Sequence, residues 1–423
     1  MDLIPAFLLA KCVRLAARLR GGGSAFPGLV LLKMVPDVLS RKLSNLPLGV
    51  IFVTGSNGKS TTTSMLASLL RAHGLAVFTN PAGGNLPQGL ASALVGQATP
   101  WGRLRADIAV LEVDEAYGHQ IAELVNPDWV LLTNVQVDQL NRFGEPENVY
   151  RMLHDLAARA NAGVVLNAGD ANLSVMGRSL VDQGVRVETV AIAPEATASA
   201  AHGLVSAPLF FDGEALDNLS PLATLTSMGN AQASISFGET SVEVTLPAPG
   251  LHYGVDAALA LAMAQVVSEG TIATVDIERA FSHGEPVYGR GETISYRGRD
   301  FALTMMKNLP SLQVNLDALE GPLERVWVAV DEGTPDPSWI YDVDLGPIDH
   351  VDVISGSKAL QWAMFLEYRG IAYGQIVEDT AEAMRVLTAM PHDTAQPVHA
   401  IVNYEVMMVI RRLAGYKELE GRR

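Results

Sequence analysis

Residues 50–62 decide the fold of this chain, and they read Val-Ile-Phe-Val-Thr-Gly-Ser-Asn-Gly-Lys-Ser-Thr-Thr. The four apolar residues at the start predict a short buried strand, which runs through a glycine-containing turn into a helical stretch at residues 61–73. Gly55 and Gly58 let backbone N–H groups approach an anion, and the helix N-terminus adds unsatisfied donors. The order of strand, turn and helix therefore predicts a phosphate-binding loop.

Individual residues of this loop have predicted roles. Lys59 can bridge terminal phosphates, and Ser60 or Thr61 can offer a hydroxyl group to Mg²⁺. The strict eight-residue form of the motif fails, because its first glycine falls on Val53. The alternative interpretation is a glycine-rich turn with a capping serine. The predicted nucleotide-binding residues are Thr54, Gly55, Ser56, Asn57, Gly58, Lys59, Ser60 and Thr61.

Short apolar runs like the one before the loop recur at residues 108–113, 129–133 and 164–166. Because helical material lies between them, they predict a mostly parallel sheet covered on both faces. Short alternating segments between residues 190 and 248 predict hairpins in a variable insertion. A second α/β pattern follows, with predicted strands at residues 325–330, 350–355 and 399–402.

These patterns predict three parts of the chain. An N-terminal helical segment occupies residues 1–45, and a central ATP-binding α/β domain occupies residues 46–292. A C-terminal Rossmann-like α/β domain occupies residues 293–423.

The composition restricts the possible functions. The 423 residues include 30 basic and 46 acidic ones, a net charge of −16, which argues against broad nucleic-acid binding. Cys12 is the only cysteine, so neither an intrachain disulfide nor a cysteine-based zinc site can form. The nine histidines show no metal-ligand spacing. We expect a cytoplasmic protein without zinc.

The N-terminal segment is apolar at residues 3–10, with Asp2 before it and Lys11, Arg14 and Arg18 after it. A secretory signal peptide has its positive charges first. No stretch reaches the roughly 18–20 apolar residues that a membrane span needs. We interpret the segment as an amphipathic helix packed on the main domain, with contact at the inner face of the cell membrane as the alternative.

Polar residues end several of the predicted strands. Glu112 closes one apolar run, Asn134 the next, and Asn167 and Asp170 the one after. Carboxyl ends of parallel strands meet at one edge of a sheet, where such sheets bind ligands. Each of these residues could instead cap a helix or form an Asx turn, but together they favour a nucleotide site.

Glu112 is the predicted magnesium ligand, because Mg²⁺ prefers hard oxygen donors and takes only one or two protein carboxylates. Asp114 and Glu115 follow it and are weaker candidates, since an acidic run is often a solvated turn.

The loop and the sheet edge resemble the Mur ligase family of ATP-dependent carboxylate–amine ligases. Three stretches are similar to the MurT-type branch, the ligase subunits of lipid II isoglutaminyl synthase: residues 138–144 (DQLNRFG), 305–310 (MMKNLP) and 336–342 (DPSWIYD). The resemblance covers most of the chain and is weakest at residues 190–248.

The resemblance implies a reaction. ATP would phosphorylate the α-carboxylate of D-glutamate in the lipid II stem peptide, and ammonia would attack the acyl phosphate to give D-isoglutamine. A separate class I glutamine amidotransferase subunit would supply the ammonia in a heterodimer, since nothing around Cys12 looks like the nucleophile of a glutaminase.

The resemblance also implies residue roles. Lys59 and Ser60 would sit on the phosphates and Mg²⁺, and Glu112 would be the metal ligand. The position of Asn85 resembles one at the edge of a nucleotide or substrate site. Further ATP contacts are expected at Asn134, Asn167, Asp170, His252 and Arg290. His252 could instead cap a helix, and Arg290 could belong to a structural hinge.

Asp336 is implied to act across a subunit interface. In the family, an aspartate here orients the glutaminase histidine and completes a Cys-His-Asp arrangement. Pro335 and Pro337 would hold the segment extended. The alternative is that Asp336 caps the following turn.

The chain departs from the family pattern in three places. Many relatives have a four-cysteine zinc ribbon in the central insertion, which a single cysteine excludes, so the fold of residues 190–248 stays open. Tyr253 and Asp256 stand where related ligases often have asparagines. Gln139 occupies a position that is histidine in many amino-acid-adding Mur ligases. The rival functions are a stand-alone Mur-type or folylpolyglutamate-type ligase and a nucleotide-gated scaffold without catalysis.

Overall fold

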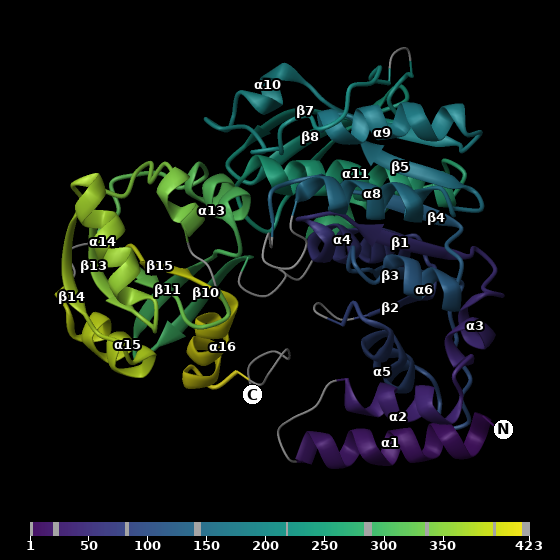
Figure 1. Ribbon diagram of the computed structural model, residues 1–423, viewed down its shortest axis with the longest axis horizontal. Helices are drawn as coiled ribbons and strands as arrows, with labels where there is room; N and C mark the ends of the chain where they lie inside the picture. The colour runs from purple at the N-terminus through teal and green to yellow at the C-terminus, as the bar shows by residue number, and fades with distance from the viewer. Residues whose placement is uncertain are drawn as a thin grey trace.

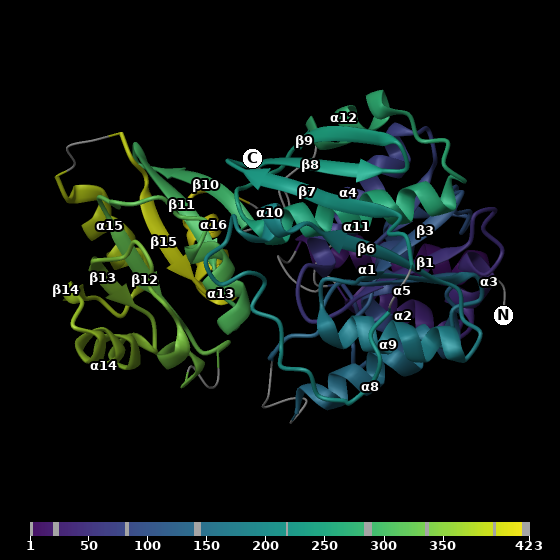
Figure 2. The same ribbon diagram turned by 90° about the horizontal axis from the view of Figure 1, so that it is seen from above.

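The structure is a computed structural model that describes residues 3–19, 25–80, 84–138, 145–216, 219–282, 290–334, 338–391 and 395–416. Two β-sheets organise the molecule, each with helices on both faces, and an N-terminal group of helices attaches to the larger unit (Figures 1 and 2). The predicted α/β class with parallel-rich sheets is confirmed.

Within the described residues the first sheet has nine strands, in the order β2-β3-β1-β4-β5-β6-β7-β8-β9. Neighbours from β2 to β7 are parallel, and β8 and β9 extend the sheet in antiparallel fashion. The bounds are β1 (Val50–Thr54), β2 (Val77–Thr79), β3 (Ile108–Glu112), β4 (Trp129–Leu132), β5 (Gly163–Asn167), β6 (Val187–Ile192), β7 (Ala223–Gly229), β8 (Gln232–Phe237) and β9 (Thr240–Thr245). The hairpins predicted between residues 190 and 248 are therefore the antiparallel end of the main sheet.

Side chains of the central strands alternate between two hydrophobic cores, one on each face of the sheet. Val50 and Phe52 of β1 belong to one core, and Ile51 and Val53 belong to the other. This alternation explains the unbroken apolar sequence of β1, because both of its faces are covered. The first core is closed by α5 (Pro87–Gln97), α6 (Gly118–Leu124), α8 (Pro146–Ala157) and α9 (Ala171–Asp182), and the second by α4 (Lys59–Ala72), α11 (Leu251–Val267) and α12 (Thr274–Ser282). A short helix, α10 (Pro194–Thr197), follows β6.

The N-terminal helices α1 (Leu3–Leu19), α2 (Phe26–Met34) and α3 (Val38–Leu43) lie beside α5, at the edge of the molecule (Figure 1). Helices α2 and α5 approach closely at Gly28, where a Cβ atom would lie 2.0 Å from the carbonyl oxygen of Gln88. The N–H of Gly28 donates to Ser92 Oγ at 2.8 Å. A larger residue would push the two helices apart. No helix among the described residues combines the length and apolarity that crossing a bilayer requires.

The second sheet, as far as it is described, has the order β10-β11-β15-β12-β13-β14. Only the β10–β11 pair is antiparallel. The strands are β10 (Arg290–Tyr296), β11 (Arg299–Met305), β12 (Val326–Ala329), β13 (His350–Ser355), β14 (Ala372–Ile376) and β15 (Val398–Val402). The helices are α13 (Leu309–Leu316), the 3₁₀ helix η1 (Ser338–Asp342), α14 (Ala359–Arg369), α15 (Thr380–Ala389) and α16 (Tyr404–Leu413). Figure 2 shows that β10, β11 and α13 form the side of this unit that faces the first sheet.

Candidate active site

The predicted phosphate loop connects β1, which ends at Thr54, to α4, which begins at Lys59. Gly55 and Gly58 have positive φ angles of 132° and 83°. A Cβ at Gly55 would lie 2.2 Å from Thr133 Oγ1, and one at Gly58 would lie 2.3 Å from Asp256 Oδ1. Both backbone conformation and space therefore require glycine at these two positions.

The segment that follows β4 fixes the loop backbone. Asn134 Oδ1 accepts from the N–H of Asn57 at 2.9 Å, and Asn134 Nδ2 donates to the carbonyl of Asn57 at 3.1 Å. Thr133 Oγ1 donates to the same carbonyl at 2.7 Å. Gln136 accepts from Asn57 Nδ2 at 2.7 Å. Asn134, a predicted site residue, therefore lies at the loop and fixes its backbone. Gln136 also fixes the loop, through Asn57, but the sequence did not indicate this residue.

Lys59 is buried under the loop. Its ammonium group donates to the carbonyls of Gly55 and Ser56, at 2.5 and 3.2 Å, and to Glu115 Oε1 at 2.6 Å. Burial by itself lowers the pKa of Lys59, but the carboxylates of Glu115, Asp138 and Glu112 outweigh burial and raise the pKa. The lysine is therefore held as a cation beside the place where phosphates would bind.

Glu112, the predicted metal ligand, ends β3 and is 4% exposed. The side-chain amide of Asn80 bonds both the N–H and the carbonyl of Glu112, at 2.9 and 3.0 Å. Asn85 Nδ2 donates to Glu112 Oε1 at 3.3 Å. The structure thus brings two predicted site residues, Asn85 and Glu112, together at the edge of the sheet.

The donors near the loop suit a magnesium ion. Ser60 stands in the first turn of α4, and Glu112 offers a buried carboxylate. The second oxygen of Asp138, Oδ1, is buried and has no hydrogen-bond partner among the described residues. Mg²⁺ takes one or two such carboxylates and fills its remaining positions with phosphate oxygens and water. The described residues hold no group of three or more His, Cys, Asp or Glu side chains that could bind a metal.

Asn167 and Asp170 lie at the end of β5 and are fully buried. Asp170 caps α9 by accepting from the N–H of Leu173 at 3.1 Å, and it accepts from the N–H of Val135 at 2.9 Å. Burial raises the pKa of Asp170, while these backbone donors oppose the rise. Asn167 donates to the carbonyl of Thr133 at 3.2 Å, and it also lines the pocket described next.

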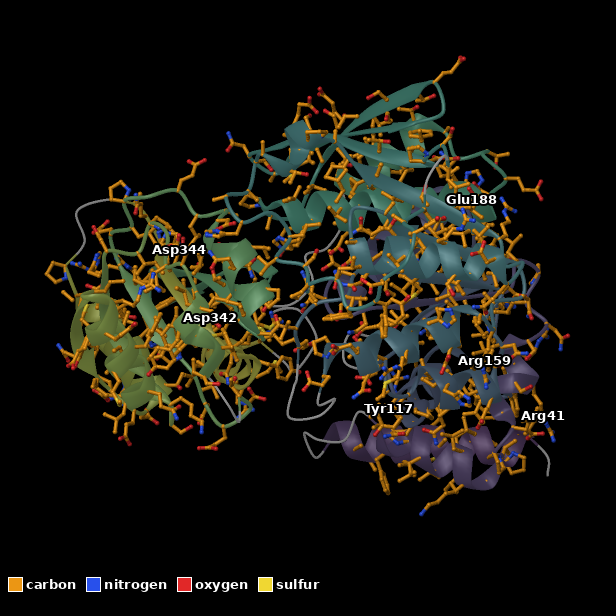
Figure 3. The ribbon with its side chains drawn as sticks, turned by 45° about the horizontal axis from the view of Figure 1, so that its top comes forward. Arg41, Tyr117, Arg159, Glu188, Asp342 and Asp344 are labelled. Carbon is orange, nitrogen blue, oxygen red and sulfur yellow. The ribbon has the colours of Figure 1, made fainter. Side chains whose placement is uncertain are left out.

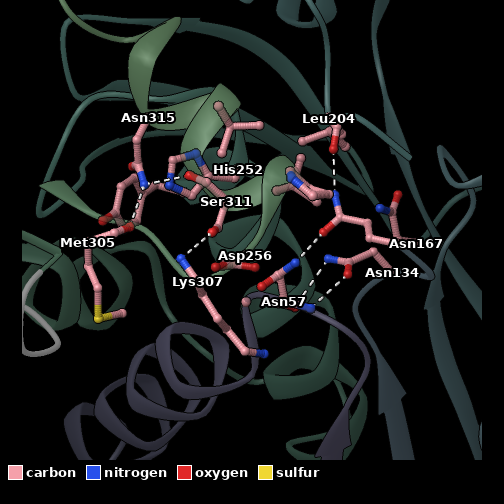
Figure 4. A pocket seen from close by; sticks show the side chains of 16 residues that line it. Asn57, Asn134, Asn167, Leu204, His252, Asp256, Met305, Lys307, Ser311 and Asn315 are labelled. Atoms are coloured by element: carbon pink, nitrogen blue, oxygen red, sulfur yellow. Dashed lines mark hydrogen bonds between the residues drawn. The ribbon is translucent and has the colours of Figure 1, made fainter. Parts of the chain in front are cut away.

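A pocket lies between the two sheets, directly beside the loop (Figure 4). One wall comes from the first unit and includes Asn57, Gly58, Asn134, Asn167, His252 and Asp256. The opposite wall comes from the second unit and includes Met305, Lys307, Ser311 and Asn315. The rings of His252 and Tyr253 are tilted against each other by 39°, with their centroids 4.1 Å apart. A ligand that enters this pocket meets the phosphate loop and both units at once.

Two residues of the second unit reach the loop itself. Lys307 Nζ bonds Asp138 Oδ2 at 2.5 Å and the carbonyl of Ser56 at 3.4 Å. The side-chain amides of Asn308 and Asn57 face each other, with Asn308 Nδ2 donating to Asn57 Oδ1 at 3.3 Å. In the sequence, residues 305–310 stood out only through their resemblance to a family motif. A lysine and an asparagine directly after a predicted strand could have indicated a second group of residues beside the phosphates.

Two predicted residues cannot be placed with their side chains. Asp336 lies outside the described residues, between Thr334 and Ser338. Arg290 begins β10, but its side chain is outside the described part. The start of η1 at Ser338 puts a 3₁₀ turn directly after the segment that contains Asp336.

Comparison with known proteins identifies the fold. Residues 53–264 match the family model of the Mur ligase middle domain. The chain is 25% identical to the lipid II isoglutaminyl synthase (glutamine-hydrolyzing) subunit MurT of Streptococcus pneumoniae, over 94% of each protein. It is 26% identical to the MurT subunit of Staphylococcus aureus, over 88% of this chain and 89% of that protein.

Among solved structures, the MurF ligase of Thermotoga maritima in complex with ADP matches with a TM-score of 0.61 at 17% identity. This match covers 90% of the present chain and 82% of that one. The likeness shows that the two chains share a fold. The middle-domain match covers half of the chain, and the MurT matches cover nearly all of it: the chain belongs to the Mur ligase family of ATP-dependent carbon–nitrogen ligases, in its MurT-type branch.

Proposed function

We propose that this chain is the ligase subunit of a lipid II isoglutaminyl synthase, which amidates the α-carboxylate of D-glutamate in lipid II. The observation that carries the proposal is the match to MurT subunits along nearly the whole chain, including the second α/β unit. Curated relatives named as L-alanine or D-glutamate ligases match 51–64% of the chain.

In the proposed reaction, a carboxylate oxygen attacks the γ-phosphorus of ATP, and ADP leaves. Ammonia then attacks the acyl carbon, inorganic phosphate leaves, and the nitrogen loses a proton to give the amide. Charge on the transferred phosphoryl group must be neutralised for this step. The loop N–H groups and the Lys59 ammonium would neutralise this charge from one side of the pocket. The ammonium of Lys307 would add a second positive charge from the opposite wall.

Ser60 and Glu112 would hold Mg²⁺, which would add positive charge at the phosphates. Asn80 and Asn85 would fix the orientation of Glu112 through the hydrogen bonds described above. Asn134 and Gln136 would keep the loop open toward the phosphates.

The ammonia in this proposal comes from a class I glutamine amidotransferase partner. The single cysteine, Cys12, is exposed on α1, within the N-terminal helices and outside the pocket lining. A second observation supports a partner on the C-terminal unit. Helix α14 exposes Leu360, Met364 and Tyr368, which recur every four residues and so share one side of the helix.

Tyr341 of η1 joins this patch, since its ring centroid lies 6.1 Å from that of Tyr368. The patch thus begins a few residues after Asp336, the residue proposed to orient the partner's histidine. Exposed apolar side chains grouped in this way are typical of protein interfaces.

The function is tested by measuring phosphate release and product mass with lipid II, ATP and either ammonia or free amino acids. We expect ammonia-dependent amidation by the chain alone, and loss of at least a hundredfold in rate in Lys59→Ala. Addition of an amino acid without use of ammonia would identify a stand-alone ligase. Nucleotide binding without turnover, unchanged in Lys59→Ala, would identify a scaffold.

The partner is tested with Asp336→Asn. This variant should lose most glutamine-dependent amidation when the glutaminase subunit is present, because the histidine of the partner loses its orienting carboxylate. Ammonia-dependent amidation should stay close to the wild-type rate. Equal loss of both activities would instead assign Asp336 to ligation or to folding.

The patch on α14 is tested with Met364→Lys. The variant should weaken co-purification with the glutaminase subunit at least tenfold, since the lysine brings charge into an apolar contact. Val275→Lys, at a 56% exposed apolar site on α12, is the matched control for Met364, which is 63% exposed. Unchanged partner affinity in Met364→Lys would move the interface elsewhere.

A further inference from the structure

We propose that the outer face of α1 is a membrane-docking surface that lies on an anionic phospholipid bilayer. The inference deepens the proposed function and rests on it for the substrate, because a lipid-linked substrate is presented at a bilayer. The contact surface itself is argued from α1.

Helix α1 is apolar on both its inner and its outer side. Ala6, Phe7 and Ala10 are completely buried against the neighbouring helices. The outer side carries Ile4, Leu8, Leu9 and Leu15, which are 41–62% exposed, and Cys12 lies among them. At 100° per residue, these five side chains fall within one continuous side of the helix.

Surface helices of water-soluble domains normally present polar residues on the outer side. A second apolar side that is open to water needs a partner of its own. Helix α2, the neighbour of α1, also exposes Phe26 and Leu29, at 54% and 40%. The apolar outer surface therefore extends over more than one helix of this segment.

The positive charge of the N-terminal segment favours an anionic bilayer as the partner of this surface. Residues 1–45 contain seven basic and two acidic residues, whereas residues 46–423 contain 23 basic and 44 acidic residues. Residues 1–45 thus have a net charge of +5, whereas the remainder of the chain has a net charge of −21. Apolar side chains combined with Lys and Arg are the composition of helices that lie in the interface of anionic membranes.

Two lysines of this segment contact neutral groups, and partial burial lowers the pKa of both Lys11 and Lys42. Lys11 Nζ donates to the carbonyl of Val95 at 2.9 Å, and Lys42 Nζ lies 5.9 Å from the centre of the Phe7 ring. Neither partner carries a negative charge, and Lys33 is exposed. The 17 residues of α1 are fewer than the roughly 20 that span a bilayer, so the helix would lie on the surface.

The first experiment is co-sedimentation of the full chain with vesicles. We expect binding to vesicles of phosphatidylcholine with 30% phosphatidylglycerol, about tenfold weaker binding to pure phosphatidylcholine, and loss of the difference in about 0.5 M salt. The double variant Leu8→Ser/Leu15→Ser should bind at least tenfold more weakly. Leu8 and Leu15 are 41% and 62% exposed, and the buried residues that pack α1 on its neighbours stay unchanged in this variant.

The control is Leu360→Ser/Met364→Ser, which changes two still more exposed apolar residues, on α14, and should bind vesicles like the wild type. Absence of vesicle binding by the wild-type chain would overturn the proposal. Equal loss in both double variants, or wild-type binding by Leu8→Ser/Leu15→Ser, would overturn it too.

Two other partners of this face are separate outcomes. If sedimentation velocity shows a wild-type dimer that Leu8→Ser/Leu15→Ser converts to a monomer, the face joins two copies of the chain. If the variant loses the glutaminase subunit, the face is the partner interface. Either result would overturn membrane docking.

The amidation assay separates this inference from the proposed function. Leu8→Ser/Leu15→Ser should amidate a short-chain, water-soluble lipid II analogue at the wild-type rate and vesicle-embedded lipid II at least tenfold more slowly. Failure of the wild-type chain on both substrates would reject the proposed function while the vesicle-binding result still stands. Equal rates of both proteins on embedded lipid II would reject docking.

Discussion

At the scale of single residues, Lys59 and Glu115 form the most confined ion pair of the site. All three hydrogens of the Lys59 ammonium have an acceptor, two of them in the loop and the third on Glu115. The side chains are 9% and 5% exposed. A phosphate that contacts Lys59 must therefore replace one of these acceptors, and Glu115 is the charged one.

We expect Glu115→Gln to lower the free energy of unfolding by about 3 kcal/mol, because it leaves a buried ammonium without its counter-ion. The variant should gain more stability from ADP and Mg²⁺ than the wild type, since phosphate charge replaces the missing carboxylate. Thermal unfolding with and without nucleotide measures both effects.

Glu123→Gln is the matched control for this prediction. Its carboxylate lies on α6, is 62% exposed and pairs only with the equally exposed His119 across one helical turn. It should change neither quantity. An identical ADP-induced rise in Tm for Glu115→Gln and the wild type would show that Glu115 does not compete with phosphate for Lys59.

At the scale of elements, α13 presents its N-terminus to the phosphate loop. Asn308 caps this helix by accepting from the N–H of Ser311 at 2.9 Å, and the same side chain bonds Asn57. One amide thus serves both the helix and the loop.

Two substitutions of Asn308 separate these roles. Asn308→Ala should cost about 1 kcal/mol of stability through loss of the cap. Asn308→Asp keeps a good capping group, so its Tm should stay near the wild type. Its negative charge beside the loop should weaken ATP binding about tenfold, measured by isothermal titration calorimetry.

Asp379, which caps α15 by accepting from the N–H of Glu382 at 2.8 Å, provides the control. Asp379→Ala should cost similar stability and leave ATP affinity unchanged, because α15 lies away from the pocket. Wild-type ATP affinity in Asn308→Asp would mean that the phosphates bind out of reach of α13.

The distance between residues along the chain explains which parts of the site could be predicted from the sequence. The loop was predictable because its strand, glycines and lysine occupy 13 consecutive residues. Glu112 was predictable because it ends an apolar run, whereas its contact with Asn85, in the segment before α5, was not. Glu115 was ambiguous, because its partner Lys59 is 56 residues away, and Asn308 meets Asn57 across 251 residues. The first pair forms only when β1 and β3 lie side by side in the sheet, and the second only when the two units are folded against each other.

At the scale of the whole molecule, a second polar contact joins the two units close to the pocket. His202, in the segment after α10, donates its N–H to Asp317 Oδ2 at 3.0 Å, and its ring Nδ1 lies 2.8 Å from Asp317 Oδ1. Lys307–Asp138 is the corresponding contact at the loop. The two contacts hold the walls of the pocket at a fixed separation.

We expect Asp317→Asn to weaken this contact and to raise the KM for ATP several-fold, since more of the molecule would have its units apart. Small-angle X-ray scattering should show a larger radius of gyration. Asp182→Asn, at an exposed site on α9, should change neither value. A raised KM without any change in scattering would place the effect within the pocket.

The two proposed contact surfaces lie far from each other. Arg41 of α3, in the N-terminal helices, and Asp342, at the end of η1, lie on opposite sides of the molecule in Figure 3. A bilayer under α1 would therefore leave the surface around η1 and α14 open to a protein.

The tight crossing at Gly28 has a mechanical consequence. Helix α5 begins two residues after Asn85, the side chain that holds Glu112, and α2 cannot shift relative to α5 without breaking the contact at Gly28. The N-terminal helices are thus connected through α5 to the edge of the sheet at Glu112. If α1 lies on a bilayer as proposed, this connection fixes the distance between the bilayer and Glu112.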